Sequence, residues 1–402
     1  GKSLSTSIMD GFKQSYSAII DANVTGFLTA IVLAYFGLGP IKGFAVVLMI
    51  GILSSLFTAV LVSRMIIDWW TKKGRGITFS IKSTENVLSK VNIDWLTKRR
   101  VAYMISGTLL LVSIASMLFR GFDLGVDFKG GYSYNVQFEH SVSPQEIRDA
   151  LSGPFEKTPV VKAVDISNTY NITTDYLVND QADDAADRVM DQLYGGVNTL
   201  MGGNLNEENF KSPEGSGTHV TSSSKVGPTI ADDIKSSSVY ATLFSLLLIF
   251  LYIFIRFNRW QFSLGAVIAL FHDTLITLGI FSLLKGIVPW SLEIDQAFIA
   301  AILTVIGYSI NDTVIVFDRI REYLNEYTKK DKFSVINDAI NSTLSRTLIT
   351  SLTTLFVVLV LFLFGGSSIK GFAFAILVGI GVGTYSSIFI ASALALVLKA
   401  TA

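Results

Sequence analysis

The sequence of 402 residues has no cysteine, and only three histidines and seven prolines. Without cysteine it cannot contain a disulfide framework, a thiolate metal site or a cysteine nucleophile. The histidines (His140, His219 and His272) are far apart in the sequence, so we expect no metal site. The net charge is zero and no convincing nucleotide-binding motif is found. We therefore expect no nucleic-acid partner, no cofactor and no enzyme.

Charged residues are also scarce, at 16% against about 25% in a typical soluble domain. Half of the residues are hydrophobic, and they gather in runs of about 20, long enough to cross a hydrocarbon core. This pattern excludes a soluble enzyme, a coiled coil and a disordered chain. Lipid offers the backbone no other partner, so each run is expected to be a transmembrane helix. The eight predicted spans are Ile19–Phe36, Phe44–Ile67, Val101–Phe119, Val239–Ile255, Leu264–Leu284, Ala297–Phe317, Leu348–Phe364 and Phe372–Leu398.

Basic residues gather in three loops between these spans, at 64–100, 256–259 and 319–332. By the positive-inside rule these loops are cytoplasmic, and eight spans place all three on the same side of the membrane. Residues 121–235 are different, because they hold 18 Asp or Glu against 8 Lys or Arg. We therefore predict that 121–235 form a small extracytoplasmic domain.

This acidic segment mixes strand and helix patterns. Their order predicts a β-α-β-β-α-β unit, and so a small α+β domain beside the helical membrane part. The Gly- and Asn-rich stretch Gly195–Gly217 is predicted to be a mobile loop. The predicted strands lie in Tyr132–Phe138, Val160–Ile166 and Asn171–Val178, and the predicted helices in Pro144–Leu151 and Ala182–Leu193.

An internal repeat is visible, because residues 20–64 align without gaps to residues 348–392. The block IKGFA occurs in both copies, at Ile41–Ala45 and Ile369–Ala373, between two spans. Both copies run in the same direction, so the repeat is parallel. Four spans and a domain precede only the second copy, and the sequence has no initial Met or signal peptide. We expect a piece of a longer protein, with a truncated first half and a complete second half.

One ionisable residue lies well inside a predicted span. Asp312 is flanked by apolar residues and is about 9 Å from the cytoplasmic edge, with Asn311 beside it. Such residues are costly in a membrane and are functional candidates. The alternative is a structural Asp bonded to a neighbouring helix. Arg346 and Thr350, early in the seventh span, are further candidates; Arg346 either pairs with Asp312 or reaches the lipid headgroups.

Four further polar residues are secondary candidates. His272 and Asp273 lie in the middle of the fifth span, but neighbouring residues on a helix are about 100° apart, so they need not share a partner. They serve either as a proton relay or as a contact between helices. Asp21 and Asn23 lie early in the first span. Asp21 lines the interface between the two halves or lies at the surface.

Several motifs together resemble the SecD/SecF protein-export subunits of the resistance–nodulation–division superfamily. The segment from Ile19 to Ala59 resembles the last two spans of SecD, and LGVDFKGG (Leu124–Gly131) resembles SecF after its first span. FHD, VIGYSINDTVIVFDRIRE and LSRTLITSLTTL resemble later SecF spans. The resemblance implies a fused SecDF arrangement: residues 1–70 the last SecD-like helices, 71–100 a cytoplasmic linker, 101–120 the first SecF-like helix, 121–235 the extracytoplasmic domain and 236–402 five further helices.

The resemblance also implies a function. Such subunits use the proton gradient to help the SecYEG translocon export preproteins across the bacterial inner membrane, in contact with lipid and protons. Asp312 matches the intramembrane SecF Asp tied to proton passage, and Arg346 the Arg near it. The N-terminal portion of SecD is missing, so this piece alone is expected to be inactive. The alternatives are a small-molecule or lipid exporter of the same superfamily and a scaffold of the Sec channel.

Overall fold

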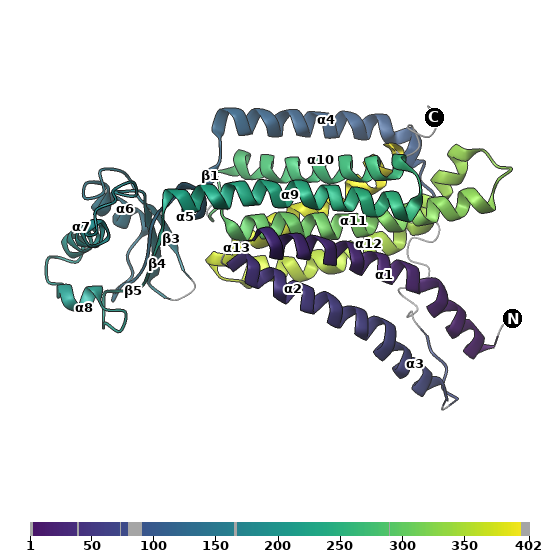
Figure 1. Cartoon of the computed structure of the whole chain (residues 1–402), viewed down its shortest axis with the longest axis horizontal. Helices are drawn as coiled ribbons and strands as arrows, with labels where there is room; N and C mark the ends of the chain where they lie inside the picture. Colours follow the sequence, from purple (N-terminus) through teal and green to yellow (C-terminus); the bar gives the residue numbers. More distant parts are fainter. Residues whose placement is uncertain are drawn as a thin grey trace.

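The protein consists of a bundle of long helices with a small α+β domain at one end (Figure 1). The computed structural model describes residues 3–37, 40–72, 74–78, 91–164, 167–288 and 290–394. The residues of the first predicted linker are therefore described only in part.

Within the described residues, eight helical segments are long and apolar enough to cross a membrane, and each corresponds to one predicted span. The second is interrupted by a π-helical turn, η1, and the last is followed by another, η2. The segments are α1 (Leu4–Phe36), α2–η1–α3 (Pro40–Phe57, Thr58–Val62, Ser63–Lys72), α4 (Trp95–Arg120), α9 (Pro228–Phe257), α10 (Trp260–Leu284), α11 (Gln296–Glu326), α12 (Lys332–Phe364) and α13–η2 (Ser367–Ser386, Ser387–Ala391).

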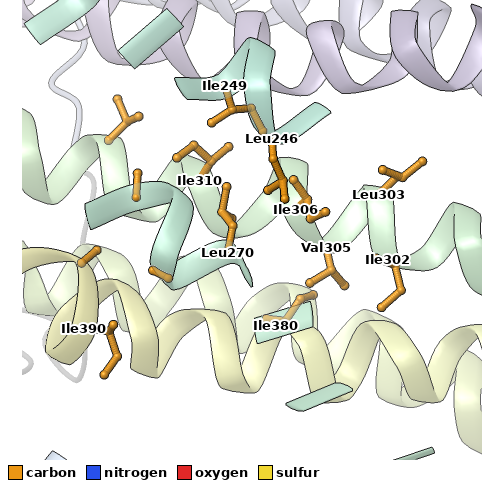
Figure 2. Close-up of a cluster of buried hydrophobic side chains, with 14 of the residues drawn as sticks. Leu246, Ile249, Leu270, Ile302, Leu303, Val305, Ile306, Ile310, Ile380 and Ile390 are labelled. Atoms are coloured by element: carbon orange, nitrogen blue, oxygen red, sulfur yellow. The ribbon is translucent and has the colours of Figure 1, made fainter. Parts of the chain in front are cut away.

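The core of the bundle lies around α10 and α11, which are the most buried helices of the described chain. Apolar side chains of α9, α11 and α13, such as Ile249, Ile306 and Ile380, meet there (Figure 2). Small residues bring the helices close together, because a Cβ at Gly279 of α10 would lie 2.1 Å from the Ser113 side chain of α4. Four of the long helices, α1, α4, α11 and α12, begin at a side-chain cap, and the Asp295 carboxylate, for example, accepts the N–H of Phe298 at 2.8 Å.

The two copies of the repeat have the same backbone plan. α1 and α12 are each 33 residues long, and Gly37 and Gly365 end them with the same hydrogen bond to the carbonyl four residues earlier. The helix that follows each of them changes into a π-helical turn at nearly the same repeat position. Phe44 and Phe372, which occupy equivalent positions, contact each other with ring centroids 6.1 Å apart. The ends of α3, α9 and α11, near the three basic loops, lie away from the α+β domain (Figure 1).

The predicted β-α-β-β-α-β order is found in the α+β domain. Its antiparallel sheet has the strand order β3-β4-β2-β5, and Tyr134, Val136 and Ile147 lie in a core between sheet and helices. The prediction of a loop over Gly195–Gly217 is wrong in part, since α7 continues to Leu200 and α8 follows, with turns and irregular chain between and after them. The elements are β2 (Gly131–Gln137), α6 (Pro144–Ser152), β3 (Val160–Ala163), β4 (Thr169–Thr174), α7 (Ala185–Leu200), α8 (Glu207–Lys211) and β5 (His219–Val226).

The domain is joined to the bundle by a second, two-stranded parallel sheet. β1 (Asp123–Leu124) pairs with β6 (Glu293–Ile294), and the short α5 (Val126–Lys129) follows β1. Gly131 begins β2 with φ +143°, and a Cβ there would lie 2.6 Å from the Thr174 carbonyl oxygen, so only glycine fits. Lys162 of β3 forms an ion pair with Glu293. Burial raises the pKa of the Glu293 carboxyl above its usual value.

Candidate functional site

Asp312 lies where three helices meet. It is on α11, is 2% exposed, and accepts a hydrogen bond from the Ser351 hydroxyl of α12 at 3.1 Å. The Thr384 hydroxyl of α13 in turn donates to Ser351 at 2.7 Å. A change at the Asp312 carboxylate therefore acts on α11, α12 and α13 together.

The predicted pairing of Arg346 with Asp312 is not found. Arg346 is exposed, and its guanidinium forms no ion pair with Asp312 within 4.0 Å. The reason is helical geometry, because Arg346 lies five residues before Ser351 and so points about 140° away from it. Thr350 donates to the carbonyl of Arg346 at 3.0 Å, and neither it nor Asn311 forms a hydrogen bond with the Asp312 carboxylate in the described part of the chain.

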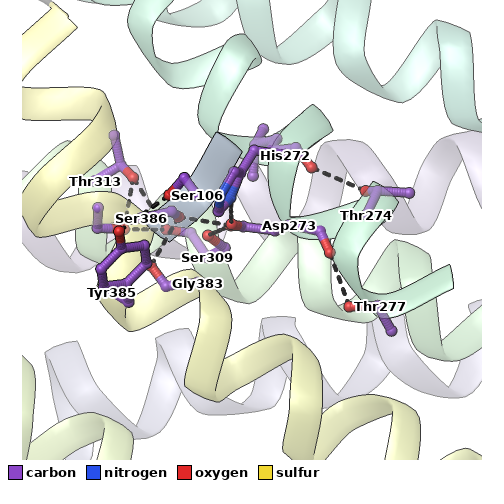
Figure 3. Close-up of polar contacts among 12 residues, drawn as sticks. Ser106, His272, Asp273, Thr274, Thr277, Ser309, Thr313, Gly383, Tyr385 and Ser386 are labelled. Atoms are coloured by element: carbon purple, nitrogen blue, oxygen red, sulfur yellow. Dashed lines mark hydrogen bonds and ion pairs between the residues drawn. The ribbon is translucent and has the colours of Figure 1, made fainter. Parts of the chain in front are cut away.

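A second buried carboxylate, Asp273 of α10, has more partners than Asp312. It is 1% exposed and accepts hydrogen bonds from Ser309 of α11 and Ser386 of α13, both at 2.8 Å (Figure 3). The Nδ1 atom of His272 lies 3.0 Å from the other carboxylate oxygen. The sequence argument left open whether His272 and Asp273 share a partner, and the structure brings them into contact with each other.

His272 is 4% exposed, and its ring lies beside that of Tyr385, with centroids 6.3 Å apart. The Tyr385 hydroxyl donates to the carbonyl of Ala102 on α4 at 2.8 Å. The Nε2 atom of His272 is buried and has no hydrogen-bond partner among the residues described. The imidazole is thus held on one side by Asp273 and left without a partner on the other.

Sequence reasoning missed the hydroxyl groups that connect these two sites. These hydroxyl groups lie close together in the sequence, at the end of α13 and the start of η2: Thr384, Ser386 and Ser387. The Ser387 hydroxyl lies 2.8 Å from the Thr313 hydroxyl of α11. The signal was present as a run of four polar residues, TYSS, in an otherwise apolar span. It falls where α13 becomes π-helical, and such turns occur often at functional sites.

Asp21 lies apart from this polar cluster. It is 5% exposed on α1, and its carboxylate pairs with Arg256 of α9 at 2.8 Å and accepts the Tyr252 hydroxyl at 2.6 Å. Of the two predicted alternatives, the interface between the halves is therefore correct. Asn23 donates to the carbonyl of Ile19 at 2.7 Å within its own helix. Arg256 also lies 3.6 Å from Asp318.

Comparisons with known proteins agree on one family. The model described as "Protein export membrane protein SecD/SecF, C-terminal" matches residues 207–401, and the "SecD/SecF GG Motif" matches residues 115–142, which include Gly130 and Gly131. The protein translocase subunit SecF of Rhodothermus marinus is 46% identical over 316 residues, which cover 79% of this chain and 96% of that protein.

Fused relatives match the whole chain. The protein translocase subunit SecDF of Thermus thermophilus is 35% identical over 99% of this chain, but only 50% of that protein is covered. A crystal structure of SecDF, described as a translocon-associated membrane protein from a Thermus species, matches with a TM-score of 0.81 and 32% identity over 100% of this chain and 51% of that chain. The chain thus spans about half the length of the SecDF proteins that it matches.

Proposed function

Because the chain belongs to the SecD/SecF family of protein-export membrane proteins, we propose that it is part of an accessory subunit of the Sec machinery, one that uses the proton gradient to promote preprotein export. In this proposal Asp312 is the proton-coupling carboxylate. The partners are the SecYEG translocon, the preprotein and the N-terminal portion of a SecD-like half. The protein lies in the bacterial inner membrane, with the α+β domain outside the cytoplasm.

The observation that carries the proposal is the environment of Asp312. A carboxylate that is 2% exposed inside a transmembrane bundle needs a cation or a proton, and no cation lies within 4.0 Å of it among the described residues. When ionised, it can only accept the hydrogen bond that Ser351 donates. When protonated, it gains an O–H donor and loses its charge, so the bond from Ser351 weakens and the new donor needs an acceptor. Proton binding therefore alters the contacts of α11 with α12 and α13.

A route from this carboxylate to the α+β domain supports the same proposal. α11 begins at Gln296, whose N–H donates to the Asp127 carboxylate of α5 at 3.1 Å. Glu293, directly before α11, pairs with Lys162 of the domain sheet. A shift of α11 along its axis is therefore passed to the domain through two polar contacts.

The test is export of a reporter preprotein by the full-length protein and its Asp312→Asn variant, each with and without a proton gradient. We expect the variant to lose the gradient-dependent part of export while its membrane insertion stays normal. Asp233→Asn, at an exposed position of α9, is the matched control and should export normally. Equal gradient-dependent export by Asp312→Asn and the unaltered protein would contradict the proposal and favour the scaffold or the exporter.

A further inference from the structure

We propose that His272 and Asp273 form a second proton-binding site in the bundle, which takes up one proton at His272 Nε2. The role of this proton in export rests on the proposed function, whereas the binding of the proton does not. The site is distinct from Asp312, because its hydrogen bonds run to α10, α11 and α13 and those of Asp312 run to α12.

The first argument is charge balance. Asp273 is 1% exposed, and among the described residues no Lys or Arg lies within 4.0 Å of its carboxylate. With Asp273 ionised and His272 neutral, the pair carries one negative charge in a medium that penalises it heavily. One added proton makes the pair neutral overall. Its neighbour His272 is the basic side chain that can take up that proton.

The second argument is where the proton goes. An ionised carboxylate can only accept, so the His272 nitrogen that lies 3.0 Å from it, Nδ1, must carry a hydrogen. The remaining nitrogen, Nε2, is then the basic atom. It is buried without a hydrogen-bond partner in the described chain, so nothing from the protein competes for its lone pair. Protonation there converts the imidazole to an imidazolium that stays bonded to Asp273.

The third argument is that the surroundings are built around the carboxylate. Both serine hydroxyls that donate to Asp273 lie 2.8 Å away, and they come from different helices. Gly383 allows α13 to approach this closely, since a Cβ there would lie 2.8 Å from the Ser309 hydroxyl and 3.5 Å from the Asp273 carboxylate. A purely structural contact between helices would need one such bond, and here three donors surround one anion.

Other ionisable groups on the packed helices do not neutralise the pair. Tyr385 of α13 stacks beside His272 but gives its hydroxyl hydrogen to α4. Asp312 of α11 is itself an acid, and Arg256 of α9 pairs with Asp21 and Asp318. Tyr103 of α4, Tyr308 of α11 and Tyr252 of α9 are phenols, which are uncharged at neutral pH.

α13 connects the two acid sites. Ser386 donates to Asp273, and Thr384, two residues earlier, donates to the serine that holds Asp312. The two residues project about 200° apart, so α13 faces one acid on each side. When His272 becomes an imidazolium, the pull of Asp273 on Ser386 weakens, because the cation shares the carboxylate charge. Because the same helix also donates to the serine that holds Asp312, the two protonation events are coupled through α13.

The site is tested by magnetic resonance on full-length protein in lipid, with ¹⁵N-labelled histidine and ¹³C-labelled aspartate, from about pH 4 to about pH 9. The His272 signal is assigned from its absence in His272→Gln. We expect this ring to change from imidazole to imidazolium as the pH falls. In Asp273→Asn the ring should remain neutral to a lower pH than in the unaltered protein, because the adjacent anion is lost. Asp233→Asn should leave the titration of the ring unchanged.

Absence of any change in the ring over this pH range would overturn the site, and a change of the Asp273 carboxyl alone would place the proton on the wrong residue and overturn it as well. Its role in coupling has a separate readout, since His272→Gln should lose gradient-dependent export, whereas His219→Gln, in the α+β domain, should retain it. Full export by His272→Gln would overturn the coupling role. The proposed function can fail separately from the His272 site. In that case the Asp312→Asn variant would export normally, while its His272 ring would still titrate.

Discussion

The two copies of the repeat share a backbone but occupy different surroundings. In the second copy, half of the most apolar stretch of its last helix is buried, chiefly against α10 and α11. In the first copy only 6% of the most apolar stretch of α2–η1–α3 is buried, and η1 has no buried residue. The second helix of the pair is therefore half buried in one copy and almost fully exposed in the other, whereas the first helix shows the reverse order, with 33% buried in α1 and 17% in α12. The repeated sequence determines the helix lengths and turns, and the neighbouring helices determine how much of each copy is buried.

The chemistry of the copies follows these surroundings. Thr384 and Ser387 of the second copy lie in the polar cluster, and Leu56 and Ala59 stand at their positions in the first copy. The first copy instead contributes Asp21, which pairs with α9. The apolar, exposed α2 suits contact with lipid or with further helices. Under the proposed function, those helices belong to the N-terminal portion of a SecD-like half.

The largest effect is expected from breaking the attachment of the first copy to the bundle. Asp21→Ala leaves Arg256, whose side chain is 22% exposed, without its main partner, and we expect a loss of about 3 kcal/mol of stability. The measurement is thermal unfolding of the full-length protein in detergent. Asp233→Ala, at an exposed site, is the control and should change little. An unaltered melting temperature for Asp21→Ala would show that this ion pair does not hold the first copy.

α13 of the second copy lies beside β3 of the α+β domain, and the next prediction tests the neighbouring ion pair between the domain and the bundle. A cleft of about 790 Å³ between domain and bundle is lined by Lys370 and Phe372 of α13 and by Lys162. Lys162→Met leaves Glu293, whose side chain is 8% exposed, without its cation. We expect docking to weaken by about 2 kcal/mol at neutral pH.

The pH dependence of this variant has a defined sign. Burial already raises the pKa of Glu293 above its usual 4.5, and loss of Lys162 raises it further. The docked state then binds more protons, so its stability falls as the pH rises through the raised pKa and recovers toward about pH 5. Hydrogen exchange of the β1 and β6 amides reports docking. Lys157→Met, which breaks an exposed pair with Asp175, is the control, and an equal response in both variants would contradict the prediction.

Two equivalent glycines, one in each copy, allow the packing around the two copies to be compared directly. Gly51 and Gly379 are equivalent in the repeat, but a Cβ at Gly379 would lie 2.3 Å from a Val305 methyl group, whereas one at Gly51 would meet nothing within 4 Å. Gly379→Ala should therefore destabilise the protein by about 2 kcal/mol through overpacking. Gly51→Ala should be neutral or stabilise by up to about 1 kcal/mol, since alanine favours helix. Equal unfolding temperatures for the two variants would show that the copies are packed alike.

These contrasts also mark the limit of what the sequence could predict. The eight spans, the order of helices and strands along the domain and the repeat are visible in the sequence itself, and all were predicted, although β5 was not located. Asp312 stood out because a charge in an apolar run is rare. The pairing of Asp21 with Arg256 and the exposure of Arg346 could not be predicted, because they depend on how distant helices are rotated against each other. The helix through Gly195 and Gly196 was missed because composition alone indicated a loop, whereas Gly196 packs directly against Leu151.

The smallest predicted effect concerns the point where the copies meet. Phe44 and Phe372 are equivalent residues in an edge-to-face contact, with rings 77° apart, so each contributes the same side chain to one shared contact. Edge-to-face pairs contribute about 0.5–1 kcal/mol beyond their buried area. A double-mutant cycle with Phe44→Leu and Phe372→Leu, followed by unfolding, should show a coupling of that size. In the control cycle, Phe57→Leu takes the place of Phe44→Leu, because Phe57 is an exposed residue of the first copy. This substitution should show no coupling with Phe372→Leu. Additive effects in both cycles would mean that the copies are joined only through other helices.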